Sequence, residues 1–463
     1  AQAALAQAPN SAHPRDARPS GALAPLRLLN MNGGAFWLAA LALASVLVLQ
    51  PWMTGARGAF GACARARPRS GRFSRPHARR RAGAAPDAIG RAPRRGGSAR
   101  EDVRVPRGVE VVKDARDVES VCLPLLQLEG SRAEVERLKV GNTNALYRLL
   151  AAAEGQRRLT ADGSAYLVRV FGHNPALAFD RDRENAFYEA LSAEGLAPRL
   201  LAVFGNGRVE EWLPGRPASV AECRAAEVFE QVAAQLASLH GFQTQAVRPA
   251  DTWAWATARR WLPGAREAAA AEAVQGRQDV ARRVRALDLE SVAAAAEDLA
   301  ADMDTWSLPC CFAHNDLSNT NVHWDPERRC VRLLDFEYGG TNFRGFDLAT
   351  HLSHWAGGAM DGCYDDARFP SRSEQAVFLA AYSDAAARRG APVTPQELGR
   401  EVALSTPLAH LVWGLWALCM LPLALVGPPS RFSHLEYAER RLRAFRCAWD
   451  RVKSSSASGE RGL

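Results

Sequence analysis

The chain has 463 residues, 48% of them hydrophobic, which is enough for roughly two to three domains or lobes with a sizeable core. Its net charge of +8 would suit a nucleic-acid or membrane partner, but residues 54–100 alone hold 13 arginines against one acid, Asp87. The rest of the chain, from residue 101, is mildly acidic and has no nucleic-acid-binding footprint. Nine scattered cysteines without a C-x-x-C pair argue against a disulfide framework and a zinc site, and they fit a reducing compartment.

The N-terminal extension, residues 1–105, combines an apolar run with an arginine-rich stretch. Residues 36–49 are too short for a bilayer span of about 20 residues but suit the core of a signal peptide. The Arg/Ala/Gly/Pro-rich stretch after them is typical of a transit peptide, and with Phe60 the two resemble the leader of proteins sent to plastids of secondary origin. The alternatives are a membrane anchor with a disordered basic tether, or mistranslated upstream sequence with Met31 as the translation start. We exclude the extension from fold reasoning.

Residues 106–214 predict a small lobe rich in β-strand. Its first hairpin turns at small polar residues, which let backbone N–H groups approach phosphate oxygens: Gly141, Asn142, Thr143 and Asn144. The strand over 165–171 carries one charge, Arg169, and the helix over 180–191 carries Glu184 near its start. We predict that Arg169 pairs with Glu184, because kinase-like folds hold the α/β-phosphates with a strand cation paired to a helix carboxylate.

A second hairpin is expected over residues 198–213, since Asn-Gly in the turn is a strong hairpin signal. In a two-lobed kinase, Glu211 and Trp212 at its end would form the hinge, where backbone groups contact adenine. A helix from about Val220 to His240 then opens the second lobe, residues 215–453, and its start has the spacing of a capping box. Residues 454–463 are expected to be a disordered tail.

The most specific motif, H-x-D-x-x-x-x-N, comprises His314, Asp316 and Asn321 and precedes a hairpin that ends at Asp335. The start of one antiparallel strand lies beside the end of the next, so Asn321 and Asp335 should lie together near Asp316. Asp316 can accept the proton of a substrate hydroxyl, while Asn321 and Asp335, with Glu337, offer oxygen ligands for magnesium. His314, grouped with Asp316 as a catalytic candidate, is expected to hold the loop backbone. The alternative is a polar loop that caps a hairpin.

At this point the sequence resembles the choline/ethanolamine kinase family. The matching segments are 314–321, the Asp-Phe-Glu-Tyr block at 334–351, the Trp-Gly-Leu-Trp block at 410–418, and, in the same order, 141–147, 168–171 and 207–213. The resemblance covers about residues 110–450. It implies an α+β, two-lobed protein-kinase-like fold, with a small β-rich N-lobe and a larger, mostly helical C-lobe. It also implies ATP and Mg²⁺ as cofactors, and ethanolamine or choline as the acceptor.

The resemblance places Arg169 where protein kinases have a lysine, and it lines the acceptor pocket with Trp413, Trp416 and Tyr437. The two tryptophans are three residues apart and therefore share a helix face, and aromatic faces attract an ammonium group. Residues 408–426 also have the length and composition of a transmembrane helix, but we favour a buried helix.

The sequence departs from the family at His354, which replaces a carboxylate near the substrate cation. The acids that could serve instead are Asp347 and the cluster Asp361, Asp365 and Asp366. Residues 317, 356–357 and 417 are similar to ethanolamine kinases and residues 344–347 to choline kinases, and we favour ethanolamine.

We expect a phosphotransferase that acts in the first step of the CDP-ethanolamine or CDP-choline route to phospholipids. The alternatives are a kinase for another small hydroxyl compound, or a catalytically silent kinase-like binding module. The expected partners are ATP and ethanolamine or choline, with no nucleic acid; an N-terminal membrane or targeting contact and a homodimer are further expectations. The catalytic part is of a cytoplasmic type, and the extension suggests plastid or other organelle targeting, or membrane anchoring.

Overall fold

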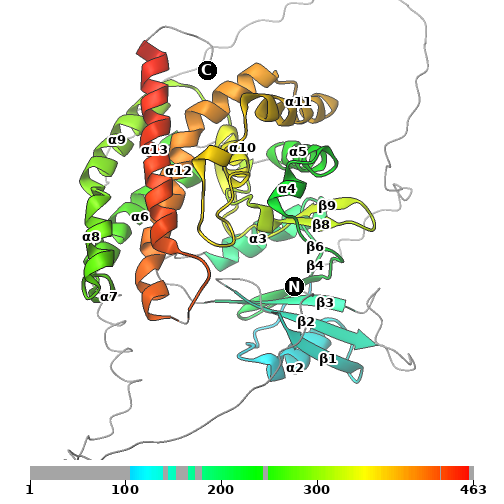
Figure 1. Cartoon of the computed structure of the whole chain (residues 1–463). Coiled ribbons are helices and arrows are strands. Elements are labelled where there is room, and N and C mark those ends of the chain that lie inside the picture. The colour runs from blue at the N-terminus through cyan, green and yellow to red at the C-terminus, as the bar shows by residue number, and fades with distance from the viewer. Residues whose placement is uncertain are drawn as a thin grey trace, which may run out of the picture. The chain divides into compact units, whose positions relative to one another are not determined.

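The computed structural model describes residues 105–138, 144–152, 165–172, 180–242, 249–427 and 429–457. These residues belong to one compact unit that consists of a small lobe rich in strand and a larger helical lobe (Figure 1). The predicted α+β, two-lobed fold is confirmed. The extension, residues 1–104, and the predicted phosphate-turn residues Gly141, Asn142 and Thr143 lie outside the described residues.

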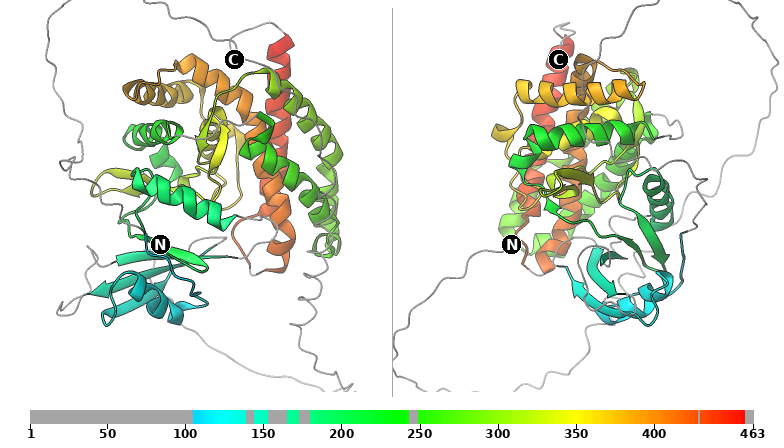
Figure 2. Two further views of the ribbon diagram at one scale, coloured as in Figure 1. Left: turned by 180° about the vertical axis from the view of Figure 1, so that it is seen from behind. Right: turned by 90° about the vertical axis from the view of Figure 1, so that its right-hand side faces the viewer.

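The N-lobe is built on a five-stranded antiparallel sheet with the strand order β1-β2-β3-β5-β4. Figure 2 shows this lobe, in cyan to green, below the larger helical lobe from two further sides. Its elements are α2 (Ala115–Leu125), β1 (Arg132–Arg137), β2 (Asn144–Ala152), β3 (Ala165–Phe171), α3 (Arg181–Ala193), β4 (Leu200–Phe204) and β5 (Gly207–Glu211). Helix α2 packs against β1, β2 and β4, and alternating apolar side chains of the sheet form a core beneath it with Val118 and Cys122 at its centre.

The chain that enters the N-lobe covers the outer edge of β4. Backbone N–H groups of Gly108 and Gly205 donate to Val203 and Glu110 at 2.9 and 2.8 Å. The Asn206 side chain, in the tight turn between β4 and β5, both accepts from and donates to the backbone of Val112. The residues just before α2 are therefore paired to the sheet.

The C-lobe follows the hinge and is mostly helical. Its strands are β6 (Arg216–Pro217), β7 (Cys310–Ala313), β8 (Val322–Asp325), β9 (Cys330–Leu333) and β10 (Gly340–Phe343). Its helices are α4 (Val220–Cys223), α5 (Ala226–His240), α6 (Trp253–Ala270), α7 (Glu272–Gln275), α8 (Gln278–Ala286), α9 (Leu289–Thr305), α10 (Arg344–His354), α11 (Arg372–Arg388), α12 (Pro395–Val426) and α13 (His434–Ala457). Short 3₁₀ turns lie at Pro249–Asp251, Asn319–Asn321 and Asp366–Arg368.

Helix α12 is the central element of the C-lobe, and it packs against α6, α10 and α13. It can approach α13 closely because Gly414 has no side chain; a Cβ there would lie 2.8 Å from a methyl group of Leu442. Among the described residues, α12 is the one helix with the length and composition of a membrane span, yet 67% of its most apolar window is buried. This burial is what the core helix of a globular lobe requires.

Two predicted boundaries need correction. The helix expected from Val220 to His240 is interrupted between Cys223 and Ala226, although the predicted capping box of Ser219 and Glu222 is present. Helix α13 continues to Ala457, so the first four residues of the predicted disordered tail are helical.

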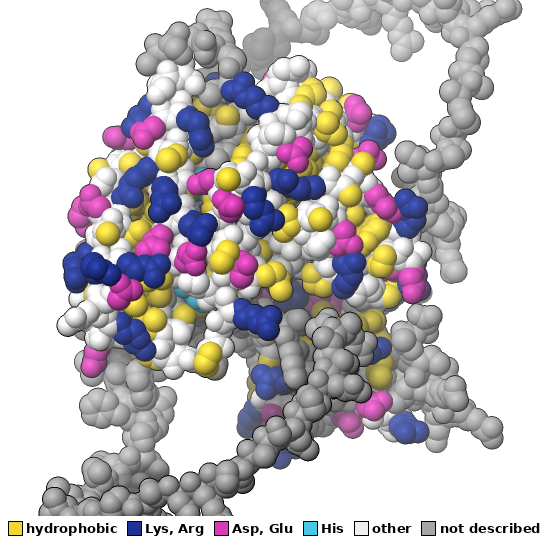
Figure 3. Space-filling view, viewed as in Figure 1, with side chains coloured by type: hydrophobic (Ala, Val, Ile, Leu, Met, Phe, Trp, Pro, Cys, Tyr) yellow, Lys and Arg dark blue, Asp and Glu magenta, His cyan; other side chains and the backbone are white. Residues whose placement is uncertain are grey.

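The surface of the C-lobe carries charges of both signs. On the face shown in Figure 3, basic and acidic side chains are interspersed. Ion pairs such as Arg283 with Glu439 and Arg440 with Glu436 bring charges of opposite sign into contact. Mixed charge of this kind supports solubility rather than a single-sign binding surface.

Candidate active site

The loop between β7 and β8 carries the H-x-D-x-x-x-x-N motif, and a buried carboxylate holds its backbone. Asp347, in the first turn of α10, accepts hydrogen bonds from the N–H groups of His314 and Asn315, each at 2.7 Å. His240 of α5 contacts the same carboxylate at 3.1 Å and is itself bonded to Tyr382 of α11. Three helices therefore fix the loop that presents Asp316.

His314 has a structural role in this loop. Its Nε2 donates to the carbonyl oxygen of Leu334 at 2.8 Å, so Nδ1 is the acceptor and faces the N–H of Asp316 at 3.4 Å. Burial lowers the pKa of His314, and the ring is fully enclosed. The neutral ring ties the loop to the end of β9, as the sequence suggested, and it is not placed as a catalytic group.

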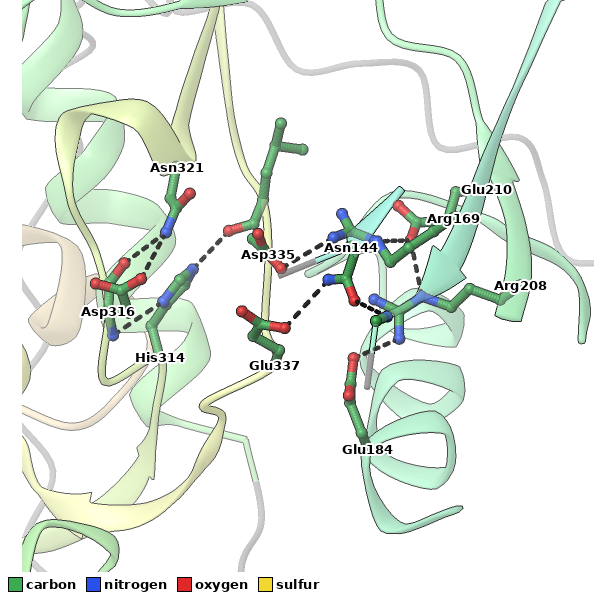
Figure 4. A network of polar contacts seen from close by, with 12 residues as sticks. Asn144, Arg169, Glu184, Arg208, Glu210, His314, Asp316, Asn321, Asp335 and Glu337 are labelled. Carbon is green, nitrogen blue, oxygen red and sulfur yellow. Dashed lines mark hydrogen bonds and ion pairs between the residues drawn. The ribbon is translucent and has the colours of Figure 1, made fainter. Parts of the chain in front are cut away.

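The hairpin β8–β9 brings the predicted catalytic and metal-binding residues together. Val322 pairs with Leu333, and the N–H of Leu334 donates to the carbonyl of Asn321 at 2.9 Å, so Asn321 and Asp335 leave the sheet side by side. The Asn321 amide donates to the backbone and carboxylate oxygens of Asp316 at 2.7 and 3.2 Å. Figure 4 shows Asp335 between Asn321 and the N-lobe. The predicted proximity of these three side chains is present.

The electrostatics of Asp316 favour proton acceptance. Burial, followed by the charges of Asp335 and Glu337, raises the pKa of Asp316 well above its usual range, while the hydrogen bond from Asn321 acts in the opposite direction. A carboxylate with a raised pKa is a stronger base than an exposed one, which suits a group that takes a proton from an alcohol.

Two residues of this site have left-handed backbone conformations. Asn315 has φ of 69° and Asp335 has φ of 64°, values that non-glycine residues rarely adopt and that cost free energy. Asn315 is held there by hydrogen bonds from its amide to the carbonyl of Tyr338 and from Asn342 to its own oxygen. The strain aims the neighbouring functional side chains at one point.

The predicted pair between Arg169 and Glu184 is absent, and each has another partner. Arg169 donates to Glu210 at 3.0 Å and to Asp335 at 3.1 Å, whereas Glu184 accepts from Arg208 at 2.7 Å. Arg208 also binds Glu210, so Glu210 connects the two guanidinium groups (Figure 4). Arg169 and Arg208 are register partners on β3 and β5, which explains how one carboxylate serves both.

The other predicted nucleotide contacts have mixed outcomes. Asn144 does not point freely into a phosphate turn, since its amide donates to Glu337 at 3.1 Å and its oxygen accepts from Gly172. The backbone N–H of Glu211 is not free to contact adenine, because it donates to the carbonyl of Arg199. The Glu211 carboxylate accepts a hydrogen bond from the N–H of Arg199. The backbone of Trp212 has no hydrogen-bond partner among the described residues, and its ring lies under Arg148.

An aromatic cluster lies beside the catalytic carboxylates. Trp413 and Trp416 contact each other with ring centroids 5.9 Å apart, and Trp416 is 6.4 Å from Tyr437. Tyr338, which the sequence analysis left unassigned, stands edge-on to Trp413 at 5.4 Å. Asn315 of the catalytic loop donates to the carbonyl of Tyr338 at 2.8 Å, so Tyr338 joins this loop to the cluster. Burial, then the charges of Glu337 and Asp316, raises the pKa of Tyr338. The sequence signal for a site role of Tyr338 is its position directly after Glu337.

Two predicted acceptor-binding residues have other surroundings. Asp347 is fully buried beneath the catalytic loop and therefore serves the loop rather than the acceptor. His354, the last residue of α10, is buried, and neither ring nitrogen has a hydrogen-bond partner in the structure. Burial, then the charge of Arg441, lowers the pKa of His354 well below its usual value, so the ring is neutral.

The donor set fits magnesium. The Asn321 amide nitrogen is occupied by Asp316, which leaves its Oδ1 as the outward atom beside the carboxylate of Asp335. Mg²⁺ takes one or two protein carboxylates, with waters and substrate phosphates completing its coordination, so this pair of oxygens is sufficient. Glu337 is a less direct candidate because Asn144 and Arg181 engage its carboxylate.

A proton-accepting aspartate, two oxygen ligands on one hairpin and a cation from the opposite lobe define a kinase with an alcohol acceptor. The sequence profile of the Choline/ethanolamine kinase family matches residues 135–446. The chain belongs to the choline/ethanolamine kinase family.

Relatives agree with this assignment, and solved structures share the fold. The chain is 29% identical to "Ethanolamine kinase 2" of Rattus norvegicus over 68% of its own length and 76% of the relative. It is 26% identical to "Probable choline kinase 2" of Arabidopsis thaliana, covering 71% and 89%. A solved choline kinase from Cryptosporidium parvum superposes with a TM-score of 0.58 at 20% identity, covering 74% of this chain and 97% of that one. An ethanolamine kinase of Plasmodium vivax gives 0.56 at 20% identity, covering 69% and 84%; both share the fold.

Proposed function

We propose that the protein transfers the γ-phosphoryl group of ATP, with Mg²⁺, to the hydroxyl of a small amino alcohol of the ethanolamine and choline type. The single observation that carries this proposal is that the loop presenting Asp316 contacts both Asn321, which lies beside Asp335, and Tyr338 of the aromatic cluster. A hydroxyl at Asp316 would place an attached ammonium group against those rings.

The roles of the residues follow from their contacts. Asp316 accepts the proton of the acceptor hydroxyl while the oxygen of that hydroxyl attacks the γ-phosphorus, and ADP leaves. Asn321 keeps the Asp316 carboxylate in position through its amide. Arg169, aligned by Glu210, is placed to bind phosphate oxygens. Asn321 and Asp335 would hold magnesium, which would neutralise charge on the transferring phosphoryl group.

The faces of Trp413, Trp416 and Tyr338 offer cation–π contacts to the ammonium group, on the order of 0.5–2 kcal/mol each. The Tyr437 ring lies behind them and is bonded through its hydroxyl to Arg441. An aromatic lining of this kind suits the ammonium group of a small amino alcohol.

The test is ATP consumption by the full chain with ethanolamine, choline, their methylated intermediates and an aminoglycoside. Turnover that is highest for the amino alcohols supports the proposal. Turnover with the aminoglycoside alone would favour the kinase for another hydroxyl compound. ATP binding without turnover of any acceptor would favour the silent binding module.

Two variants refine this test. Asp316→Asn should abolish turnover while ATP still binds, whereas Asp384→Asn, on the exposed side of α11, should keep full turnover. Trp413→Phe should raise the KM for the amino alcohol several-fold more than the KM for ATP. Equal effects on both KM values would mean that Trp413 is only a core residue.

A further inference from the structure

The core of the C-lobe contains a buried positive charge without a carboxylate partner. Arg441 of α13 is fully buried, and its guanidinium donates to Nδ1 of His410 at 2.9 Å and to the hydroxyl of Tyr437 at 2.8 Å. Its Nε has no partner, and within the described part of the chain no Asp or Glu makes an ion pair with it. Because a guanidinium cannot lose its proton in proteins, this charge is not neutralised.

The groups around Arg441 do not supply the missing charge. The ring of Tyr364 lies 4.6 Å and that of Tyr437 lies 5.0 Å from its central carbon. Burial and the charge of Arg441 lower the pKa values of His354 and His410 well below the usual range, so both rings are neutral. His354 has two unpartnered ring nitrogens in the same electrostatic environment. Buried charges and polar groups are normally paired, and unpaired ones are costly.

This arginine–histidine cluster, defined as Arg441, His354 and His410, adjoins the aromatic cluster. Tyr437 is bonded to Arg441 and contacts Trp416, and His410 lies one turn before Trp413 on α12. The aromatic cluster in turn joins the catalytic loop, because Tyr338, which contacts Trp413, accepts a hydrogen bond at its carbonyl from Asn315, the residue before Asp316, at 2.8 Å. An acceptor with its hydroxyl at Asp316 would therefore extend towards the arginine–histidine cluster.

We propose that the preferred acceptor carries a carboxylate in addition to its hydroxyl and amino groups, and that Arg441 and His354 bind this carboxylate. The acceptor class is then the small hydroxy amino acids, of which serine is ethanolamine with a carboxylate on the carbon that bears the nitrogen. A carboxylate would satisfy the Nε donor of Arg441 and the N–H donor of neutral His354, and it would neutralise the buried charge. This inference rests on the proposed kinase function.

The reaction remains a simple phosphoryl transfer. The hydroxyl oxygen of the amino acid forms a bond to the γ-phosphorus while the bond to the ADP oxygen breaks, and the hydroxyl proton passes to Asp316. The products are ADP and an O-phospho amino acid, and no oxidant or additional reactant is needed.

The test compares kcat/KM of the full chain for ethanolamine, L-serine, L-threonine and L-homoserine at saturating Mg²⁺ and ATP. We expect at least one hydroxy amino acid to exceed ethanolamine by about tenfold or more. Turnover of ethanolamine with no turnover of any hydroxy amino acid would overturn this inference and leave the proposed kinase function intact. Absence of turnover with both groups, in a chain that binds ATP, would contradict both.

Two substitutions test the residues. His354→Glu gives Arg441 an internal carboxylate, so it should lower kcat/KM for the hydroxy amino acid about tenfold or more and move the preference towards ethanolamine. Arg441→Met should raise the KM for the hydroxy amino acid by about 100-fold, with the KM for ATP changed much less. The matched control is Arg443→Met, two residues along α13 on its exposed side, which should behave as the wild type.

A final arm separates a substrate carboxylate from a free anion. If the cluster takes a free anion, acetate would stimulate turnover of ethanolamine and the hydroxy amino acids would remain inactive, which would overturn the proposal. If acetate inhibits the hydroxy amino acid reaction competitively, the carboxylate subsite is supported.

Discussion

Arg169 reaches across the two lobes and donates to the carboxylate of Asp335 at 3.1 Å, while Glu210 holds its Nε at 3.0 Å. Arg169 comes from the centre of the N-lobe sheet, and Asp335 from the end of the catalytic hairpin. One contact therefore joins the cation proposed to bind phosphate to the carboxylate proposed to bind metal, across the two lobes.

Asp335→Ala should reduce kcat by about 1,000-fold or more, because a metal ion contributes several kcal/mol to transition-state stabilisation. The residual activity should need a higher Mg²⁺ concentration, which a magnesium titration of the rate would measure. Asp384→Ala is the control on an exposed helix face, and it should keep the wild-type magnesium dependence. Wild-type turnover in Asp335→Ala would remove the metal role from this residue.

Asp347→Ala should slow catalysis, although Asp347 holds the catalytic loop and is not a substrate-binding residue. It leaves the buried N–H groups of His314 and Asn315 unpaired, at about 1–3 kcal/mol each, so the unfolding midpoint should fall clearly. A misplaced loop would lower kcat by about 100-fold with little change in the KM for ATP. Asp347→Asn keeps one acceptor oxygen, so its unfolding midpoint and its kcat should lie between those of the wild type and of Asp347→Ala. Unchanged stability in Asp347→Ala would contradict the positioning role.

Glu210 neutralises two buried guanidinium groups in the N-lobe. Burial alone would raise its pKa, but Arg169 and Arg208 lower the pKa of Glu210 to about 2. Glu210→Gln should cost about 3–5 kcal/mol of unfolding free energy, as expected for a buried ion pair that loses one partner. The neighbouring change Glu211→Gln, at a partly exposed site, should cost less than about 1 kcal/mol. Denaturant unfolding of both variants measures the difference, and equal losses would argue against the network.

Acid should begin to destabilise the C-lobe at pH values well above those at which carboxylates titrate. Burial lowers the pKa of His351 and of His434 to about 4, compared with 6.5 for a free side chain. Below pH 6.5 these histidines bind protons in the unfolded chain but not in the folded protein. Their contribution to the free energy of unfolding is therefore fully present above pH 6.5 and is lost as the pH falls towards 4. Each such histidine adds a slope of about 1.4 kcal/mol per pH unit. Thermal unfolding between pH 7.5 and 5 tests this, and His434→Gln should reduce the slope; a flat profile would contradict it.

The sequence predicted the local features of the site well, because they depend on neighbouring residues. The hairpin that joins Asn321 to Asp335 and the capping box at Ser219 both follow from short-range patterns and are present. The roles of Trp413 and Trp416 came from their spacing on one helix together with the family resemblance.

The failures came from partners that are distant in the chain. Arg169 was assigned to Glu184 by spacing, but the register of β3 against β5 gives it Glu210. Asp347 was assigned to the acceptor because it is an acid near the right motif, and only the packing of α10 on β7 reveals its backbone partners. Strand register and helix packing are long-range properties that composition and spacing do not determine.

The pairing of residues 106–112 along β4 has a consequence for where the polypeptide can be cut. This segment satisfies backbone groups on the last strand of the sheet, and an uncovered strand edge is a template for self-association. Cleavage after Lys113 would remove this cover and expose the edge of β4, which favours aggregation.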